Sequence, residues 1–109
     1  MTFVTKLRFE SGDRAVLDET VEGLKGLLER KGAECKGPHA DSPDRKRVPQ
    51  YRSLAPGDSY GNWTYTVYTR RMEIHGNEHI AREVTMKEFP PSVHVEVEVE
   101  QRNPLGGHN

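Results

Sequence analysis

Two segments near the ends of the chain alternate between apolar and polar residues, which is the pattern of a half-buried β-strand. Residues 2–10 place Phe3, Leu7 and Phe9 on one side and Lys6, Arg8 and Glu10 on the other. In residues 92–101 the alternation sets Val93, Val95, Val97 and Val99 against His94, Glu96, Glu98 and Glu100. We therefore expect each strand to bury one face and expose the other, as in an antiparallel sheet that is covered on one side.

Helical spacing follows the first of these strands and returns near residue 77. Residues 14–31 predict a helix, with Asp13 as its N-cap and Gly32 as its left-handed stop. Its apolar stripe consists of Leu17, Val21, Leu24 and Leu28. A shorter helix is expected to start at Asn77 and to end before Phe89, because a residue that precedes a proline avoids the helical region. The side chains that it should bury are Ile80, Ala81 and Val84.

Two strands are expected in the middle of the chain. Residues 33–36 predict a short one that ends at Gly37 and Pro38, and residues 63–74, rich in aromatic and β-branched residues, predict a long one. The alternation of the long strand slips, since Trp63, Tyr65 and Val67 share one face while Met72 and Ile74 fall on the other. A β-bulge near Arg70 and Arg71 would bring both apolar sets to one side, and we predict one there.

Residues 38–62, between these two strands, form an unusually long connection for a compact domain. The segment contains four prolines and a basic run but few apolar anchors, so we expect residues 41–61 to be mobile in the isolated protein. A hairpin arm through Val48 and Tyr51 is the alternative, in which Pro49 restricts that stretch to the edge of a sheet.

The order β-α-β-loop-β-α-β predicts an α+β fold of the ferredoxin-like, split β-α-β type. It consists of a four-stranded antiparallel sheet with two helices on one face and a long loop or hairpin arm between strands two and three. Residues 1–101 are expected to form a single domain, and residues 38–62 are its extended basic loop. Residues 102–109 are expected to form a flexible tail. Because the last strand lies beside the first in this fold, Lys6 and Arg8 should face the glutamate row in a cross-strand charge ladder. A protein-docking face is the alternative for that row.

Composition narrows the class of protein. With a formal net charge of -1 over 109 residues, the whole chain does not attract nucleic acid, so such binding needs a local basic patch. The single Cys35 excludes an internal disulfide and fits a reducing cytoplasm. No apolar run approaches the length of a membrane span, and the N-terminus lacks the apolar core of a signal peptide. A cytoplasmic location is expected.

The best candidate for a functional site is the basic loop, with Arg45, Lys46, Arg47, Tyr51 and Arg52. Arginine and lysine neutralise phosphates, and tyrosine stacks on unpaired bases, so these residues suit RNA. The alternative is a solvated loop whose charges only keep the protein soluble. The adjacent arginines at 70 and 71 either extend the basic surface or pair with Glu73 or other strand neighbours.

Catalytic and metal-binding patterns are absent from the sequence. His75 and His79 lie four residues apart around a helix start, but other candidate ligands lie on other expected elements, so we predict neither a metal nor a cofactor. The sequence contains no nucleophile elbow, phosphate-binding loop or paired Cys-His signature. We therefore do not expect an enzyme.

Three stretches resemble the small-subunit ribosomal protein ten family in its archaeal and eukaryotic style. Gly32 and Ala33, with Gly37 and Pro38 after them, are similar to that family's helix exit and Gly-Pro turn. Residues 63–74 resemble its strand with an aromatic start, a central His-x-Arg and a final Asp-Ile, and here the central triplet is Tyr68-Thr69-Arg70. Residues 89–97 are similar to its closing Val-Pro-x-x-Val-x-Ile-Glu-Ile strand.

The resemblance implies a structural protein of the small ribosomal subunit that contacts ribosomal RNA and neighbouring small-subunit proteins and is monomeric when free. The RNA-binding residues that it implies, together with the basic loop, are Arg45, Lys46, Arg47, Tyr51, Arg52, Tyr68 and Arg70. The family's strand histidine is replaced by tyrosine, and Lys87 stands where an apolar residue is usual. These departures fit a diverged paralogue as well as the primary ribosomal copy. Such a paralogue would act as a protein-interaction module in transcription or ribosome-associated regulation.

Overall fold

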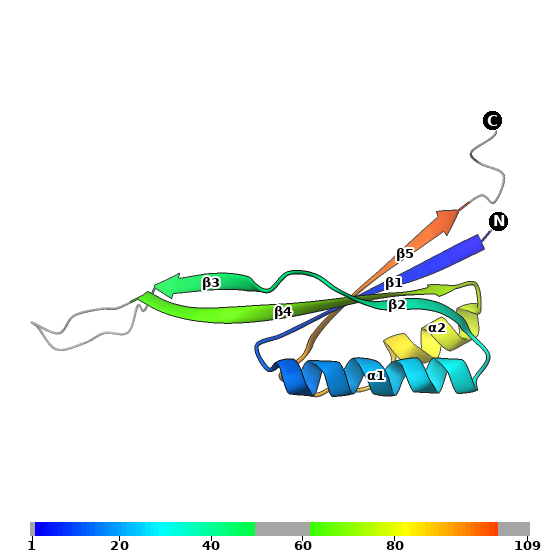
Figure 1. The fold of residues 1–109 in the computed structure, drawn as a ribbon. Coiled ribbons are helices and arrows are strands. Elements are labelled where there is room, and N and C mark those ends of the chain that lie inside the picture. Colours follow the sequence, from blue (N-terminus) through cyan, green and yellow to red (C-terminus); the bar gives the residue numbers. More distant parts are fainter. Residues whose placement is uncertain (1, 50–61, 103–109) are drawn as a thin grey trace, which may run out of the picture.

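The computed structural model describes residues 2–49 and 62–102 (Figure 1). The elements in chain order are β1 (Thr2–Ser11), α1 (Arg14–Arg30), β2 (Glu34–Ala40), β3 (Asp44–Pro49), β4 (Asn62–His75), α2 (Glu78–Thr85) and β5 (His94–Arg102). The predicted order of strands and helices is confirmed, with one additional strand, β3, in the segment that was expected to be a loop.

The main sheet has the strand order β2-β4-β1-β5, and all of its neighbouring strands are antiparallel. Both helices lie on one face of this sheet, and none of the described residues covers the other face with a helix (Figure 1). The ferredoxin-like fold class is therefore confirmed. No helix in the described part of the chain is long and apolar enough to cross a membrane.

The core lies between the sheet and the two helices, and it is built from the apolar sides of the predicted elements. Its fully buried side chains include Leu7, Phe9, Leu17, Val21, Leu24, Leu28, Met72 and Ile74. Asp13 caps α1 as expected, since its Oδ1 accepts a hydrogen bond from the backbone N–H of Val16 at 3.1 Å. Asn77 precedes α2 as expected, but its side chain does not cap the helix and instead donates to the carbonyl of His75 at 3.2 Å.

The predicted β-bulge at Arg70 and Arg71 is wrong. β4 pairs with β1 without a register shift from Tyr68 to His75, and the irregularity lies in β2, between Lys36 and His39. The slip in the apolar pattern of β4 has a different cause. Its first half pairs with β3 outside the main sheet, so the apolar side chains there need not face the core.

The segment after β2 forms a hairpin arm, which was the alternative to a mobile loop. β3 pairs with the first half of β4 from Asp44↔Val67 to Pro49↔Asn62. Residues 44–49 are therefore a paired strand and not a loop, and backbone pairing along the extended β4 offsets the entropy lost on ordering them. The rest of that expectation concerns residues 50–61, which lie outside the described residues.

The open face of the sheet carries the predicted charge ladder. β5 lies beside β1, and Lys6 Nζ is 2.7 Å from Glu100 Oε2, while Arg8 Nη1 is 3.7 Å from Glu96 Oε2. Arg102 Nε also donates to Glu100 Oε1 at 2.9 Å. The interpretation as cross-strand pairs is therefore confirmed.

Glu100 is expected to titrate well below an ordinary glutamate. Hydrogen bonds from Lys6 and Arg102 lower the pKa of its carboxyl from 4.5 to about 2. Because this pKa is lower in the folded protein, the stabilising contribution is present above pH 4.5 and is lost as the pH falls toward 2. A carbon-detected NMR titration measures the midpoint, and Lys6→Ala should move it upward. A midpoint near 4.5 in the unmodified protein would contradict the ladder.

The predicted burial of the valine row from Val93 to Val99 is correct only for its first half. Val93 is 7% exposed and Val95 packs on the core, but Val97 is 42% and Val99 is 61% exposed. β5 is the edge strand of the sheet, and an open groove lies between Val99 and α2. Alternation showed which side these valines occupy, but the placement of the helices sets how much of that side is covered.

Candidate nucleic-acid interface

The hairpin arm, comprising β3 and residues 62–67 of β4, extends away from the two helices (Figure 1). It brings the basic run, residues 45–47, opposite an uncharged part of β4. Arg45 pairs with Thr66, Lys46 with Tyr65 and Arg47 with Thr64. Because directly paired residues of an antiparallel sheet point to the same face, Arg45 and Thr66 lie on one face of the arm, and Lys46 and Tyr65 on the other.

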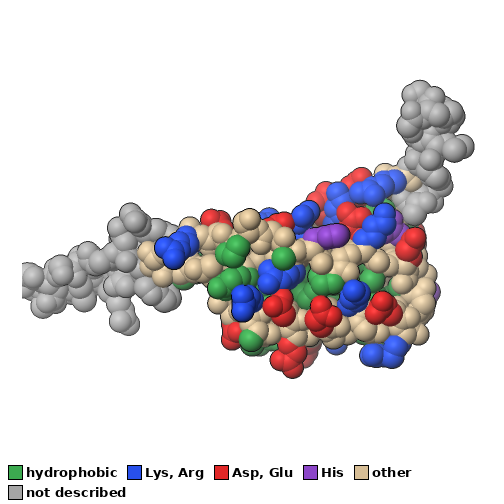
Figure 2. Space-filling model, viewed as in Figure 1, with side chains coloured by type: hydrophobic (Ala, Val, Ile, Leu, Met, Phe, Trp, Pro, Cys, Tyr) green, Lys and Arg blue, Asp and Glu red, His purple; other side chains and the backbone are tan. Residues whose placement is uncertain are grey.

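The arm has an excess of positive charge. Its described residues include three cations and one carboxylate, Asp44. Lys46 Nζ lies 3.4 Å from Asp44 Oδ2, whereas exposed Arg45 has no ion pair within the described parts of the chain. Over the body of the protein, acidic and basic side chains are interspersed in the view of Figure 2. The arm is therefore a local basic feature of a chain whose net charge is -1.

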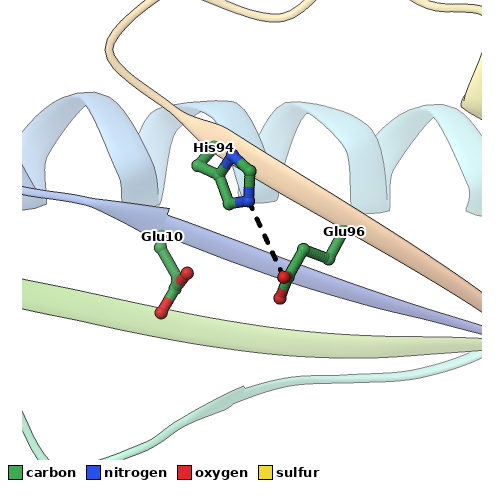
Figure 3. A group of neighbouring side chains, drawn as sticks. All are labelled: Glu10, His94 and Glu96. Atoms are coloured by element: carbon green, nitrogen blue, oxygen red, sulfur yellow. Dashed lines mark ion pairs between the residues drawn. The ribbon is translucent and has the colours of Figure 1, made fainter.

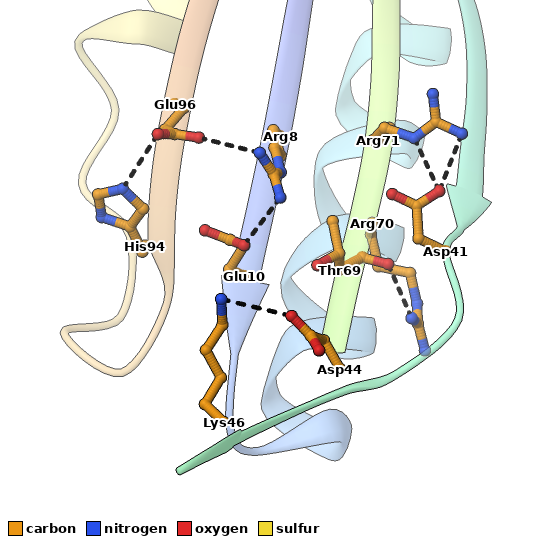
Figure 4. A network of polar contacts seen from close by, with 10 residues as sticks. All are labelled: Arg8, Glu10, Asp41, Asp44, Lys46, Thr69, Arg70, Arg71, His94 and Glu96. Carbon is orange, nitrogen blue, oxygen red and sulfur yellow. Dashed lines mark hydrogen bonds and ion pairs between the residues drawn. The ribbon is translucent and has the colours of Figure 1, made fainter. Parts of the chain in front are cut away.

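At the base of the arm, Arg70 and Arg71 bind carboxylates that are distant in sequence. Arg70, whose side chain is 13% exposed, donates from Nε to Asp18 Oδ1 of α1 at 2.8 Å. Its Nη1 donates to the carbonyl of Thr69 at 3.0 Å (Figure 4). Arg71 donates from Nε to Asp41 Oδ1 at 3.0 Å, and its Nη2 lies 2.9 Å from the same oxygen. These pairs tie β4 to α1 and to the segment that leads into β3. Neither arginine pairs with Glu73.

The predicted RNA-binding residues thus fall into three groups. Arg45, Lys46 and Arg47 lie together on β3. Tyr68 is half-buried against the core, and Arg70 is held by α1, so neither presents a free side chain on the arm. Tyr51 and Arg52 lie outside the described residues, as does the side chain of Arg47. No local pattern could have identified Asp18 or Asp41 as partners, since they lie 52 and 30 residues from their arginines.

The structural role of Arg70 can be tested against that of its neighbour. Arg70→Ala is expected to lower the free energy of unfolding by about 1–2 kcal/mol, because it removes two hydrogen bonds from a largely buried guanidinium. Arg71→Ala should cost less than about 1 kcal/mol, since its pair with Asp41 is exposed to water. Urea denaturation of both variants measures the difference. Equal losses would show that the contact with α1 adds nothing to stability.

One group of side chains among the described residues has metal-like spacing: Glu10, His94 and Glu96 (Figure 3). Glu10 and His94 are paired residues of β1 and β5, and their ligand atoms and those of Glu96 all lie within 4.8 Å of one another. Arg8 already occupies this group, with Nη2 3.1 Å from Glu10 Oε2 and Nη1 3.7 Å from Glu96 Oε2. A guanidinium in this position repels a cation, so the group belongs to the charge ladder.

Comparison with known proteins relates the chain to ribosomal proteins. Residues 6–98 match the family described as Ribosomal protein S10p/S20e. The chain is similar to the small ribosomal subunit protein uS10 of Methanopyrus kandleri, with 30% identity over 84% of this chain and 92% of the relative. It is also similar to the uS10 proteins of Saccharolobus islandicus and Saccharolobus solfataricus, each with 24% identity over 86% of this chain and 94% of the relative.

Proposed function

The chain belongs to the ribosomal protein S10p/S20e family, and from this premise we propose that it binds ribosomal RNA of the small subunit through the hairpin arm. The family consists of structural proteins of the small ribosomal subunit, so the expectation that the chain is not an enzyme is confirmed. We further propose a cytoplasmic location and contacts with neighbouring small-subunit proteins.

The observation that carries this proposal is the placement of the basic run. Arg45 and Lys46 occupy consecutive positions of β3, so their side chains lie on opposite faces of the arm. A narrow two-stranded arm with cations on both faces suits insertion between RNA segments, because each face meets a separate line of phosphates. The uncharged residues of β4 opposite the basic run add no carboxylate that would repel the phosphates. Tyr68 and Arg70 are not included in the proposed contact, because both side chains pack against the body.

Replacing Arg45, Lys46 and Arg47 together with alanine is expected to weaken binding to small-subunit ribosomal RNA at least about tenfold at low salt. Each phosphate contact releases close to one counterion from the RNA. Loss of the contacts should therefore make the slope of log K against log salt shallower by about 2. Filter binding or fluorescence anisotropy over a series of salt concentrations measures both quantities.

The matched control removes three cations from α1 instead, with Arg14, Lys25 and Arg30 changed to alanine. This variant has the same net charge as the arm variant and should retain most of the affinity and of the salt slope. Equal losses in the two variants would indicate diffuse attraction and would count against the arm. Unchanged binding of the arm variant would refute the proposed contact.

The second candidate function is a protein-interaction module in transcription or ribosome-associated regulation. It is favoured by the exposed apolar side chains Phe3, Val97 and Val99 on the body of the protein. Affinity capture with and without nuclease distinguishes the two functions. If every partner is lost after nuclease treatment, the interaction module is excluded as the main role.

A further inference from the structure

The outer edge of β5 is an unprotected strand edge. β5 is the last strand of the main sheet, so the backbone groups on the far side of residues 94–100 have no neighbouring strand among the described residues. It pairs with β1 without a register shift over nine residues, from Thr2↔Arg102 to Glu10↔His94, and contains neither glycine nor proline. The opposite edge, β2, is interrupted by the irregularity at Gly37 and Pro38. Natural sheets protect their edges with prolines, bulges or charged side chains, and of these β5 has only the charges on its open-face side.

The helix-facing side of this edge is apolar and uncovered. Val97 and Val99 are 42% and 61% exposed, and Phe3 of the neighbouring β1 is 36% exposed. Beside them, between the sheet and α2, lies a groove of about 320 Å³ whose lining includes Phe3, Ala81 and Val99. An apolar side chain next to Val99 would therefore find a hollow to fill.

The open-face side of the same edge is acidic. Glu96 and Glu100 are engaged by Arg8 and Lys6 of β1, but Glu98 makes no ion pair in the described part of the protein. The side chain of Glu98 is exposed in the middle of β5. A lysine or arginine on a strand added beyond β5 would pair with Glu98, as Lys6 and Arg8 of β1 pair with the other two glutamates.

We propose that β5 accepts an extended segment of another protein as an additional strand, and that this segment alternates basic and apolar side chains. Its backbone would pair with the free edge, its apolar side chains would cover Val97 and Val99, and its lysines or arginines would face Glu98. β1 has this same chemistry, since its Lys6 and Arg8 face the glutamates while Leu7 and Phe9 face the core.

A second copy of this chain fits the edge poorly. Antiparallel pairing of two β5 strands with their helices on the same side aligns the acidic residues of one copy with those of the other. Like charges directly opposite each other destabilise a strand pair, so the edge favours a basic partner over itself. The surface also lies at the end of the sheet away from the arm (Figure 1), so it does not depend on the proposed RNA contact.

The test uses the full chain and three short fluorescent peptides, in which lysine alternates with valine, lysine with serine, or glutamate with valine. At about 150 mM salt, the lysine–valine peptide is expected to bind at least about tenfold tighter than the other two, because only it satisfies both faces of the edge. Glu98→Lys and Val99→Ser should each weaken its binding roughly fivefold. Both residues are exposed, and circular dichroism checks that the variants remain folded.

The matched control is Glu22→Lys, which makes the same charge change at an exposed position of α1 and should leave peptide binding unchanged. Hydrogen exchange followed by NMR should show new protection at alternate amides of β5. Equal affinity for the lysine–serine peptide, equal loss in Glu22→Lys, or new protection on β2 instead of β5 would each overturn the proposal. A dimer of the free protein in sedimentation equilibrium would also overturn the proposal if Glu98→Lys changed the dimerisation, because the edge would then bind a second copy. None of these experiments contains RNA, so their failure leaves the proposed function of the arm untouched.

Discussion

Replacing Phe9 with alanine is expected to lower the free energy of unfolding by about 3–5 kcal/mol. Phe9 is completely buried on the helix-facing side of β1, and its ring meets that of Phe89 edge to face, with the centroids 5.7 Å apart. The substitution removes a large apolar side chain and leaves a cavity, because surrounding β-strands and helices relax only partly around it. Since small domains have a total stability of about 5–15 kcal/mol, such a loss should be evident in a urea denaturation curve.

Phe3→Ala is the matched control for this substitution. It deletes the same atoms from the same face of the same strand, but Phe3 is 36% exposed and lines an open groove beside α2. Its cost should be well below that of Phe9→Ala, because part of the ring is already in water and no closed cavity forms. Equal costs at the two positions would contradict the placement of the core between the sheet and the helices.

Gly37→Ala is expected to cost about 2–4 kcal/mol, for two physical reasons. Gly37 has a φ of 104°, which an L-residue with a side chain rarely adopts. A Cβ atom there would also lie 2.7 Å from the carbonyl oxygen of Arg71, and that oxygen is part of the β4 backbone. Because β2 leads directly into the arm, the substitution should also shift the NMR signals of β3.

Gly23→Ala provides the comparison for Gly37→Ala. Gly23 lies in the middle of α1, where an added Cβ would meet nothing within 4 Å, so alanine should stabilise the helix by up to about 1 kcal/mol. Thermal unfolding of the two variants should therefore change in opposite directions. A destabilised Gly23→Ala, or an unaffected Gly37→Ala, would refute this assignment of backbone roles.

The elements that could be predicted from the sequence are those with a clear local signal. The alternation of β1, the stripe Leu17, Val21, Leu24 and Leu28 of α1, and the stop at Gly32 all describe neighbours along the chain, and the structure confirms each of them. The charge ladder was also predictable, because the element order implied that β5 lies beside β1. Once that neighbour is known, the period of two determines which side chains share a face.

The features that could not be predicted depend on what lies beside an element in space. The exposure of Val97 and Val99 follows from the edge position of β5 and the open groove between it and α2, although their alternation is the same as that of buried Val93 and half-buried Val95. The slip in β4 indicated a bulge, but the true cause is a second pairing partner, β3, which the sequence indicated only as the alternative to a mobile loop.

The candidate site divides in the same way. That Arg45, Lys46 and Arg47 form a basic run is a property of their order in the chain, and the sequence alone was enough to recognise it. That Arg70 does not extend this run depends on Asp18, whose Oδ1 lies 2.8 Å from Arg70 Nε although the two residues are 52 positions apart. Local periodicity and charge are encoded by residues close in sequence, whereas burial and pairing of a single side chain depend on distant segments, and those are brought together only by folding.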